Sequence, residues 1–373
     1  MLAELGPNFL VLAVVIGVIG LIFGWILRII LTIAPFAYPN AKVRGMKGKL
    51  LSQAKLDDLM ETSTLTELVG ALEGTEYEEE LMRASIGEKD IVVLEGILHN
   101  SLSNAYEKVV RMSPGRVREV LRARFKVLEV RDIKTILRAL YAGVPVRSAL
   151  EHITPTFESF YELRSVEEFV SKLEGTEYGV VLANAMTKYA ETKSLQPLEV
   201  ALDKYVYTDL WKSVETVSEP DERTLKMFFG TEIDVSNLKT LLRAKSERMP
   251  SEEIKPYLLP MGYAISDEML GVLADADDVE SIATALEGTK YGDILMNALP
   301  EYEADGSLMP LELALNSHVA EVGKKISISQ HFGVGPMIGY LSSKDAEVRN
   351  LRAIGRGVEA KLPPEKIKNL LVM

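Results

Sequence analysis

The sequence predicts an all-α protein in which three pseudo-symmetric helical repeats form a cone or funnel, preceded by one transmembrane helix. An uninterrupted apolar run of 19 residues lies near the N-terminus. Short sequence words recur at a near-constant spacing through the rest of the chain. Within these repeats apolar residues follow one another at intervals of three and four, and no sustained strand alternation occurs.

The apolar run extends from Phe9 to Leu27 and is predicted to form a retained membrane anchor. As a helix it measures roughly 28 Å, close to the ~30 Å hydrocarbon thickness of a bilayer. A cleaved signal peptide would have a basic start, whereas residues 1–8 contain no Lys or Arg. Positive charges begin at Arg28, which places the body on the cytoplasmic side. We therefore expect residues 1–37 to form an anchor, helical over about 9–27 or slightly further.

Small residues line one face of this helix, at Ala13, Gly17, Gly20 and Gly24. Such a stripe lets another helix approach closely in lipid, which predicts intimate helix packing. The alternative is that glycine is simply common in membrane helices.

Four words recur in the remaining chain. Leu-Glu-Gly-Thr-x-Tyr begins at Leu72, Leu173 and Leu286. An acidic-Val-x-Asn/Asp-Leu/Ile-basic word begins at Glu129, Asp234 and Glu347. Leu-Glu occurs at Leu94, Leu198 and Leu311, and an apolar residue precedes proline at Val144, Met249 and Leu362. The last three words keep common offsets of 104 or 105 and then 113 residues, so the repeat is not a coincidence of composition.

These words predict helix–turn–helix corners. The glycine of Leu-Glu-Gly-Thr suits the left-handed conformation that ends a helix, and the threonine suits the N-cap of the next. Proline fits a first helical turn, so the apolar-Pro words predict further helix starts.

The count of words suggests how the chain is organised. Val43 to Lys47 resembles a truncated extra copy of the acidic-Val word, giving four copies of that element against three of Leu-Glu-Gly-Thr. A ring in which the C-terminal segment returns to the first unit accounts for this difference. We expect repeats over 38–118, 119–227 and 228–340, with helices of 341–373 closing onto the first.

The composition excludes most catalytic chemistry. The chain has no Cys, its net charge is −12, and its four His residues show no metal-ligand spacing. Neither a phosphate-binding loop nor a nucleophile elbow occurs. We therefore expect no catalytic, cofactor or metal site, no nucleic-acid binding and no enzymatic activity.

Pairs of basic residues are the most distinctive polar feature. They lie four residues apart on one helical face in each repeat, at Lys134 and Arg138, Lys239 and Arg243, and Arg352 and Arg356. Arg44 and Lys47 are candidates for a degenerate fourth pair. Like charges at this spacing repel, which leaves three interpretations: internal pairing with carboxylates, including the acidic residue five positions before each pair; three basic faces that line a central axis and meet an acidic partner; or simple solvation.

Several of these words, taken in order, resemble the C subunit of archaeal-type (A-type/V-type) ATP synthases, which is homologous to the d subunit of the eukaryotic V-ATPase. The residues are Tyr38-x-Asn40-Ala41-x-Val43-Arg44-x-Met46-Lys47, the repeated Leu-Glu-Gly-Thr-x-Tyr, and Asn350-Leu351-Arg352…Leu362-Pro363…Ile367. The resemblance implies a non-catalytic central-rotor component of a proton- or sodium-translocating enzyme. It implies that a cone couples the D and F subunits of the central stalk to the membrane proteolipid ring, transmits torque and binds no nucleotide.

The apolar helix departs from that family, whose members typically begin near the equivalent of Tyr38. A rotor part cannot drag a helix through lipid past the stationary subunit beside the ring. We therefore hypothesise that the helix enters the central pore of the ring. The alternative function is a single-pass membrane scaffold of helical repeats that recruits protein partners.

Overall fold

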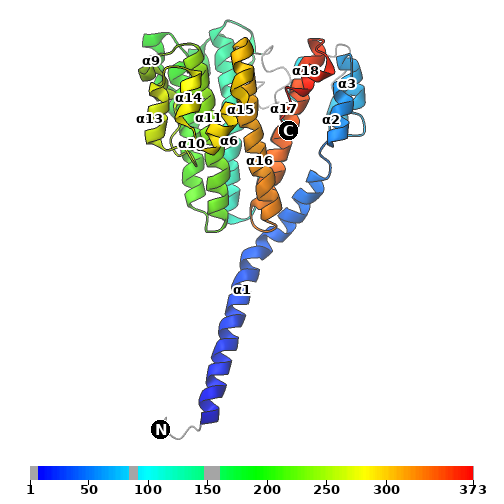
Figure 1. The fold of residues 1–373 in the computed structure, drawn as a ribbon, viewed down its shortest axis with the longest axis vertical. Helices are drawn as coiled ribbons and strands as arrows, with labels where there is room; N and C mark the ends of the chain where they lie inside the picture. The colour runs from blue at the N-terminus through cyan, green and yellow to red at the C-terminus, as the bar shows by residue number, and fades with distance from the viewer. Residues whose placement is uncertain (1–6, 84–90, 147–159, 373) are drawn as a thin grey trace.

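The computed structural model describes residues 7–83, 91–146 and 160–372, and these parts of the chain contain helices and no strand (Figure 1). The helices are α1 (Pro7–Lys47), α2 (Gln53–Met60), α3 (Leu65–Ala71), α4 (Glu78–Arg83), α5 (Ile91–Met112), α6 (Gly115–Tyr141), α8 (Val166–Lys172), α9 (Glu177–Thr192), α10 (Gln196–Glu215), α11 (Asp221–Ser246), α12 (Ser251–Ile254), the 3₁₀ helix η2 (Lys255–Tyr257), α13 (Asp267–Asp275), α14 (Val279–Ala285), α15 (Lys290–Asp305), α16 (Met309–Ser329), α17 (Gly335–Glu359) and α18 (Pro364–Lys368). The all-α fold class is confirmed.

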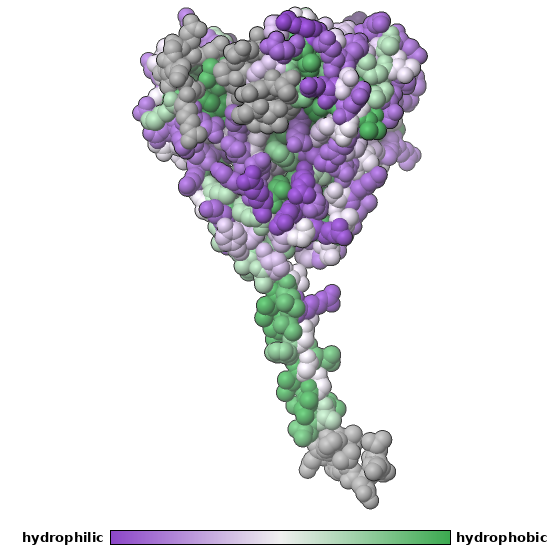
Figure 2. Space-filling view, turned by 180° about the vertical axis from the view of Figure 1, so that it is seen from behind, coloured by the Kyte–Doolittle hydropathy of each residue, from purple (hydrophilic) through white to green (hydrophobic). Residues whose placement is uncertain are grey.

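Helix α1 forms a stem that leaves the narrow end of the body (Figures 1 and 2). Its apolar residues from Val11 to Leu31 are exposed, so this surface has no partner within the body. The stem is the green, apolar part of Figure 2, and the body is mainly polar. The helix is longer than the span predicted from the first apolar run, because it continues unbroken to Lys47.

The C-terminal part of α1 is built into the body. It packs against α17 and α5, with Phe36 and Val43 buried. The Asn40 side-chain amide donates to the carbonyl oxygen of Gly333 at 3.2 Å. The stem and the body are therefore joined by continuous helix as well as by side-chain packing.

Six long helices run along the body as three consecutive hairpins: α5 with α6, α10 with α11, and α16 with α17. The α10–α11 and α16–α17 corners lie at the end from which α1 leaves (Figure 1). Contacts also join α6 to α10, α11 to α16, and α17 to α5. The last of these brings a C-terminal helix onto an N-terminal one.

The C-terminal tail is fastened by Asn350. Its amide nitrogen donates to the Val372 carbonyl at 3.0 Å, and its oxygen accepts from the Val372 N–H at 2.8 Å. Asn237 binds both backbone groups of Leu259 in the same way, at 2.7 and 2.8 Å. The Asn of the acidic-Val word thus secures the chain 22 residues later in two places.

The predicted turn chemistry is confirmed at the Leu-Glu-Gly-Thr words. Gly74, Gly175 and Gly288 all have positive φ, at 77°, 84° and 79°. Thr176 and Thr289 are the N-caps of α9 and α15, and each hydroxyl accepts an N–H at 3.1 Å. Pro250 and Pro363 occupy the N-cap positions of α12 and α18, one residue before the predicted first turn. Most of the segment that follows Pro145 lies outside the described residues.

Candidate functional site

The tyrosine of Leu-Glu-Gly-Thr-x-Tyr binds the acidic residue of the acidic-Val word at three places. The hydroxyls donate from Tyr77 to Glu347 at 2.6 Å, from Tyr178 to Glu129 at 2.6 Å and from Tyr291 to Asp234 at 3.0 Å. Burial and the neighbouring carboxylate raise the pKa of Tyr77, so its phenol stays protonated and remains a donor. These contacts explain why the two words recur together, although they are far apart in sequence.

Of these three tyrosine contacts, that of Tyr77 joins the N-terminal part of the chain to the C-terminal part. Tyr77 is 1% exposed, and Glu347 lies 270 residues further on. The buried Lys344 ammonium bonds to the Tyr77 hydroxyl at 2.7 Å, to Glu347 at 3.0 Å and also to Glu76. A largely buried polar cluster therefore fixes α17 on the turn before α4.

Replacing Tyr77 by phenylalanine is expected to lower the free energy of unfolding by about 1–3 kcal/mol, because buried Glu347 and Lys344 each lose a hydrogen-bond partner. Tyr178→Phe is the matched control. Tyr178 is only partly buried, so water can reach Glu129 and the loss should be smaller. Thermal unfolding followed by circular dichroism measures both, and an equal loss for the two variants would contradict the role given to burial.

The arginine of each basic pair binds a carboxylate inside the body, but not the acidic residue five positions before the pair. The guanidinium of each arginine binds the glutamate of a Leu-Glu word: Arg138 with Glu199 at 2.6 Å, Arg243 with Glu312 at 2.5 Å and Arg356 with Glu95 at 2.5 Å. The acidic residues five positions before each pair bind tyrosine instead. Internal pairing is therefore observed, and the predicted partner is corrected.

Pairing leaves these arginines accessible. The side chains of Arg138, Arg243 and Arg356 are 62%, 60% and 65% exposed, whereas their glutamates are 19–24% exposed. Each arginine thus remains able to bind a second anion at the surface. An exposed ion pair of this kind stabilises a fold by less than about 1 kcal/mol.

The other member of each pair differs among the repeats. Lys134 has Asp203 at 2.8 Å, and Arg352 lies 3.9 Å from Glu95. Among the described residues, Lys239 bonds to the Asn316 side-chain oxygen, at 3.3 Å, and to no carboxylate. Burial lowers the pKa of Lys239 to about 8, and the charges of nearby arginines (Arg349, Arg243 and Arg131) act in the same direction, against Glu312. Among the six residues of the three basic pairs, Lys239 is the one for which no ion pair with a described carboxylate is seen.

The free energy of unfolding is expected to rise as pH increases from about 8 to about 10.4, the pKa of an unfolded lysine. In this window the unfolded chain holds a proton on Lys239 that the folded chain has released, so higher pH favours folding. Comparing Lys239→Met with the unmodified protein isolates this contribution. The variant should be more stable below pH 8, by about 3 kcal/mol at most, and the difference should vanish near pH 10.4. A difference in melting temperature that is independent of pH would contradict the lowered pKa.

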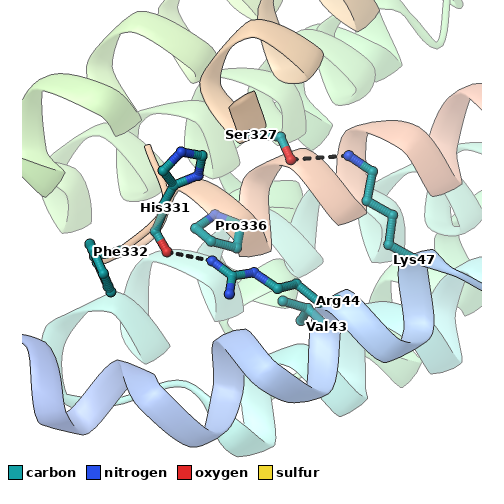
Figure 3. Close-up of a pocket in the computed structure, with 7 residues that line it drawn as sticks. All are labelled: Val43, Arg44, Lys47, Ser327, His331, Phe332 and Pro336. Carbon is teal, nitrogen blue, oxygen red and sulfur yellow. Dashed lines mark hydrogen bonds between the residues drawn. The ribbon is translucent and has the colours of Figure 1, made fainter. Parts of the chain in front are cut away.

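Arg44 and Lys47 lie where α1 meets the α16–α17 corner and do not join the three basic pairs of the repeats. Together with Val43, Ser327, His331, Phe332 and Pro336 they line a cavity of about 350 Å³ (Figure 3). Arg44 donates to the His331 carbonyl at 2.7 Å, and Lys47 donates to the Ser327 hydroxyl at 3.0 Å. Within the part of the chain that the structure describes, neither is ion-paired with a carboxylate.

The stripe of small residues on α1 is exposed. A side chain added at Gly17, Gly20 or Gly24 would meet no described atom within 4 Å. The prediction that this face packs against another helix therefore concerns a partner outside this chain. Over residues 7–83, 91–146 and 160–372 no group of His, Asp or Glu side chains is arranged to hold a metal ion.

Sequence reasoning missed two parts of this arrangement. The Asn clamps bind backbone groups, which leave no mark in a sequence. The role of Lys344 at Tyr77 was hidden because the repeat does not keep this residue: the offsets align Lys344 with Lys126, which pairs with Glu177 and Asp209, and with Thr231.

The fold and its contacts define a class: an all-α protein with repeated helix contacts and one long apolar helix. A sequence profile of the ATP synthase (C/AC39) subunit family matches residues 39–370, and the chain belongs to this family. It is 37% identical to the C subunit of the A-type ATP synthase of Methanocaldococcus jannaschii, over 93% of this chain and 89% of that protein. The corresponding C subunit of Methanothermobacter thermautotrophicus is 36% identical over 92% and 90% of the two chains.

Residues before the body are matched in at least one relative. The A-type ATP synthase C subunit of Methanobrevibacter smithii is 32% identical over 98% of this chain and 96% of its own length. An alignment that leaves 2% of this chain uncovered must extend well into the 37 residues before the body. The expectation that family members begin near the equivalent of Tyr38 therefore does not hold for this relative.

Proposed function

We propose that this chain is a non-catalytic central-rotor component of a proton- or sodium-translocating ATP synthase. It couples the D and F subunits of the central stalk to the membrane proteolipid ring and transmits torque between them. Membership of the ATP synthase (C/AC39) subunit family carries this proposal. The chain binds no nucleotide and has no active site of its own.

A torque-transmitting part must not shear when its two faces are twisted. The contacts described above support such rigidity, because the buried Lys344 cluster joins α17 to the N-terminal part of the chain and the Asn350 clamp fastens the C-terminal tail to α17. In this proposal the repeats are 38–118, 119–227 and 228–340, and residues 341–373 complete the first of them as one closed cone.

The proposed stalk-binding surface consists of the basic residues of the three repeats. The exposed arginines Arg138, Arg243 and Arg356 can each take a second anion. Lys239 gains most from an acidic partner, because it lacks a carboxylate of its own. Lys134 and Arg352 belong to the same surface but are already paired.

Helix α1 places the body on the cytoplasmic face of the cell membrane in this proposal. We place the helix inside the ring, where the stripe of Ala13, Gly17, Gly20 and Gly24 packs against ring helices or lipid. Because the chain has no cysteine, Gly20→Cys gives a unique crosslinking site. Crosslinks to the ring interior support the placement, and crosslinks to the stationary subunit beside the ring contradict it.

Native mass measurement after mild detergent extraction tests the proposed function. Co-migration with the ATPase head subunits and the proteolipid ring supports the coupling role. A free monomer or a homo-oligomer would instead favour a membrane-anchored scaffold. Lys239→Glu combined with Arg243→Glu should reduce recovery of the stalk subunits. The matched control is Lys366→Glu with Lys368→Glu, which changes two exposed lysines on α18. This control should leave the recovery of the stalk subunits unchanged.

A further inference from the structure

Arg44 and Lys47, which line the cavity at the junction of α1 and the α16–α17 corner, differ in their partners from the basic pairs of the three repeats. In the three repeats an arginine is satisfied by a glutamate of the neighbouring helix. At Arg44 a backbone carbonyl takes the place of that carboxylate, and at Lys47 a serine hydroxyl does so. Lys324 is close enough to Lys47 to repel it electrostatically. The cavity thus gathers positive charge without a described acidic residue to neutralise it.

The walls of this cavity combine two kinds of surface. Figure 3 shows Arg44 reaching from α1 past Pro336 to the carbonyl of His331, and Lys47 reaching from α1 to Ser327. Val43 and Pro336 are buried apolar walls, and Phe332 is 62% exposed. A volume of about 350 Å³ is within the range of small-molecule sites. The chemistry suits a ligand that has an anionic group beside an apolar one.

The position of the cavity identifies the source of that ligand. Exposed apolar side chains continue along α1 past Arg28 through Ile30 and Leu31, and Tyr38 is also exposed. Arg28 can snorkel, because its long stem carries its charge towards the interface. Keeping this surface out of water requires that the bilayer reach the tip of the body. Arg44 follows Tyr38 by six residues, roughly 9 Å along the helix, which is comparable with the thickness of one headgroup layer.

We propose that this cavity binds the phosphate of a membrane phospholipid headgroup, held by Arg44 and Lys47, with Phe332 against its apolar part. The inference rests on the membrane placement of α1 made in the proposed function. Arginine presents a planar fork that matches phosphate oxygens, and lysine adds a point charge. Basic residues just cytoplasmic of a membrane helix are attracted to anionic lipids in general. Here the enclosing walls add selectivity for one bound lipid.

The test uses the full-length protein in detergent and native mass spectrometry. Two lipids with identical tails are titrated: phosphatidylglycerol, and a glycolipid that lacks phosphate. The unmodified protein should retain the phospholipid in preference to the glycolipid. In Arg44→Gln/Lys47→Gln this preference should fall about tenfold, the effect of losing 1.4 kcal/mol of selective binding. The control Lys366→Gln/Lys368→Gln should keep it, and the exchange Arg44→Lys/Lys47→Arg should keep most of it.

Each other outcome overturns the inference. A double variant that folds normally by circular dichroism and keeps the full preference would show that these cations do not bind the headgroup. Inorganic phosphate that displaces the lipid at equal concentration would indicate a free-anion site. A double variant that keeps its lipid but loses the proteolipid ring would assign the cavity to a protein partner.

A second measurement separates this inference from the proposed function. Insertion into vesicles of the glycolipid alone depends on α1 and not on phosphate. Insertion without a headgroup preference would overturn only the inference. Failure to insert into any vesicle would overturn the membrane placement and the inference together.

Discussion

Replacing Lys344 by methionine is expected to lower the free energy of unfolding by about 3–5 kcal/mol, the typical result of removing one partner from a buried ion cluster. Methionine keeps most of the apolar stem, so packing changes little. Loss of the Lys344 ammonium leaves Glu347, which is 6% exposed, without its cation. Glu76 and Tyr77 each lose a hydrogen-bond donor.

The control for this prediction is Lys126→Met. Lys126 pairs with Glu177 at 2.8 Å and Asp209 at 3.1 Å, so it has as many carboxylate partners as Lys344. Its side chain is 21% exposed and that of Glu177 is 40% exposed, so water can replace the lost ammonium. We expect a loss of about 1 kcal/mol at Lys126. Chemical unfolding measures the free energy of unfolding of both variants. Comparable losses would mean that burial of the Lys344 cluster adds nothing to the stability of the first repeat.

The fold could be predicted because its repeats are marked by side chains with fixed local roles. Gly175 and Thr176 specify a left-handed residue followed by an N-cap, whatever surrounds them. The spacing of apolar residues at intervals of three and four then indicates which face of each helix packs against the body. The return of the C-terminal segment was inferred only from counting words, and the contact that carries it joins Tyr77 to Glu347 across 270 residues.

The proposed interaction surface was harder to predict, because a charged residue in a sequence does not reveal its partner. Arg243 and Glu312 are 69 residues apart, and nothing local marks them as a pair. The carboxylate that the sequence suggested as a partner, Asp234, is occupied by Tyr291 and three backbone N–H groups. The cavity beside Arg44 depends on how α1 crosses the α16–α17 corner, which no periodicity in the sequence encodes.

Placing two lysines in the stem, as Ile16→Lys with Ile22→Lys, is expected to release the protein from membranes. Both side chains are exposed, at 61% and 50%, and neither contributes to the body. A lysine near the centre of a membrane helix costs about 2.5–3.5 kcal/mol, so the two together cost about 5–7 kcal/mol of insertion free energy. This changes the partition between membrane and solution by several powers of ten.

The control Ile16→Leu with Ile22→Leu preserves hydropathy and should remain in the membrane fraction after alkaline washing. The lysine variant should appear in the supernatant with an unchanged melting temperature, because the stem is not part of the folded core. A lysine variant that resists washing as the unmodified protein does would mean that α1 is held by protein contacts that tolerate charge. Burial of α1 in a bilayer would then no longer explain why its apolar surface is so long. The two lysines thus distinguish a lipid-embedded stem from one enclosed by polar protein.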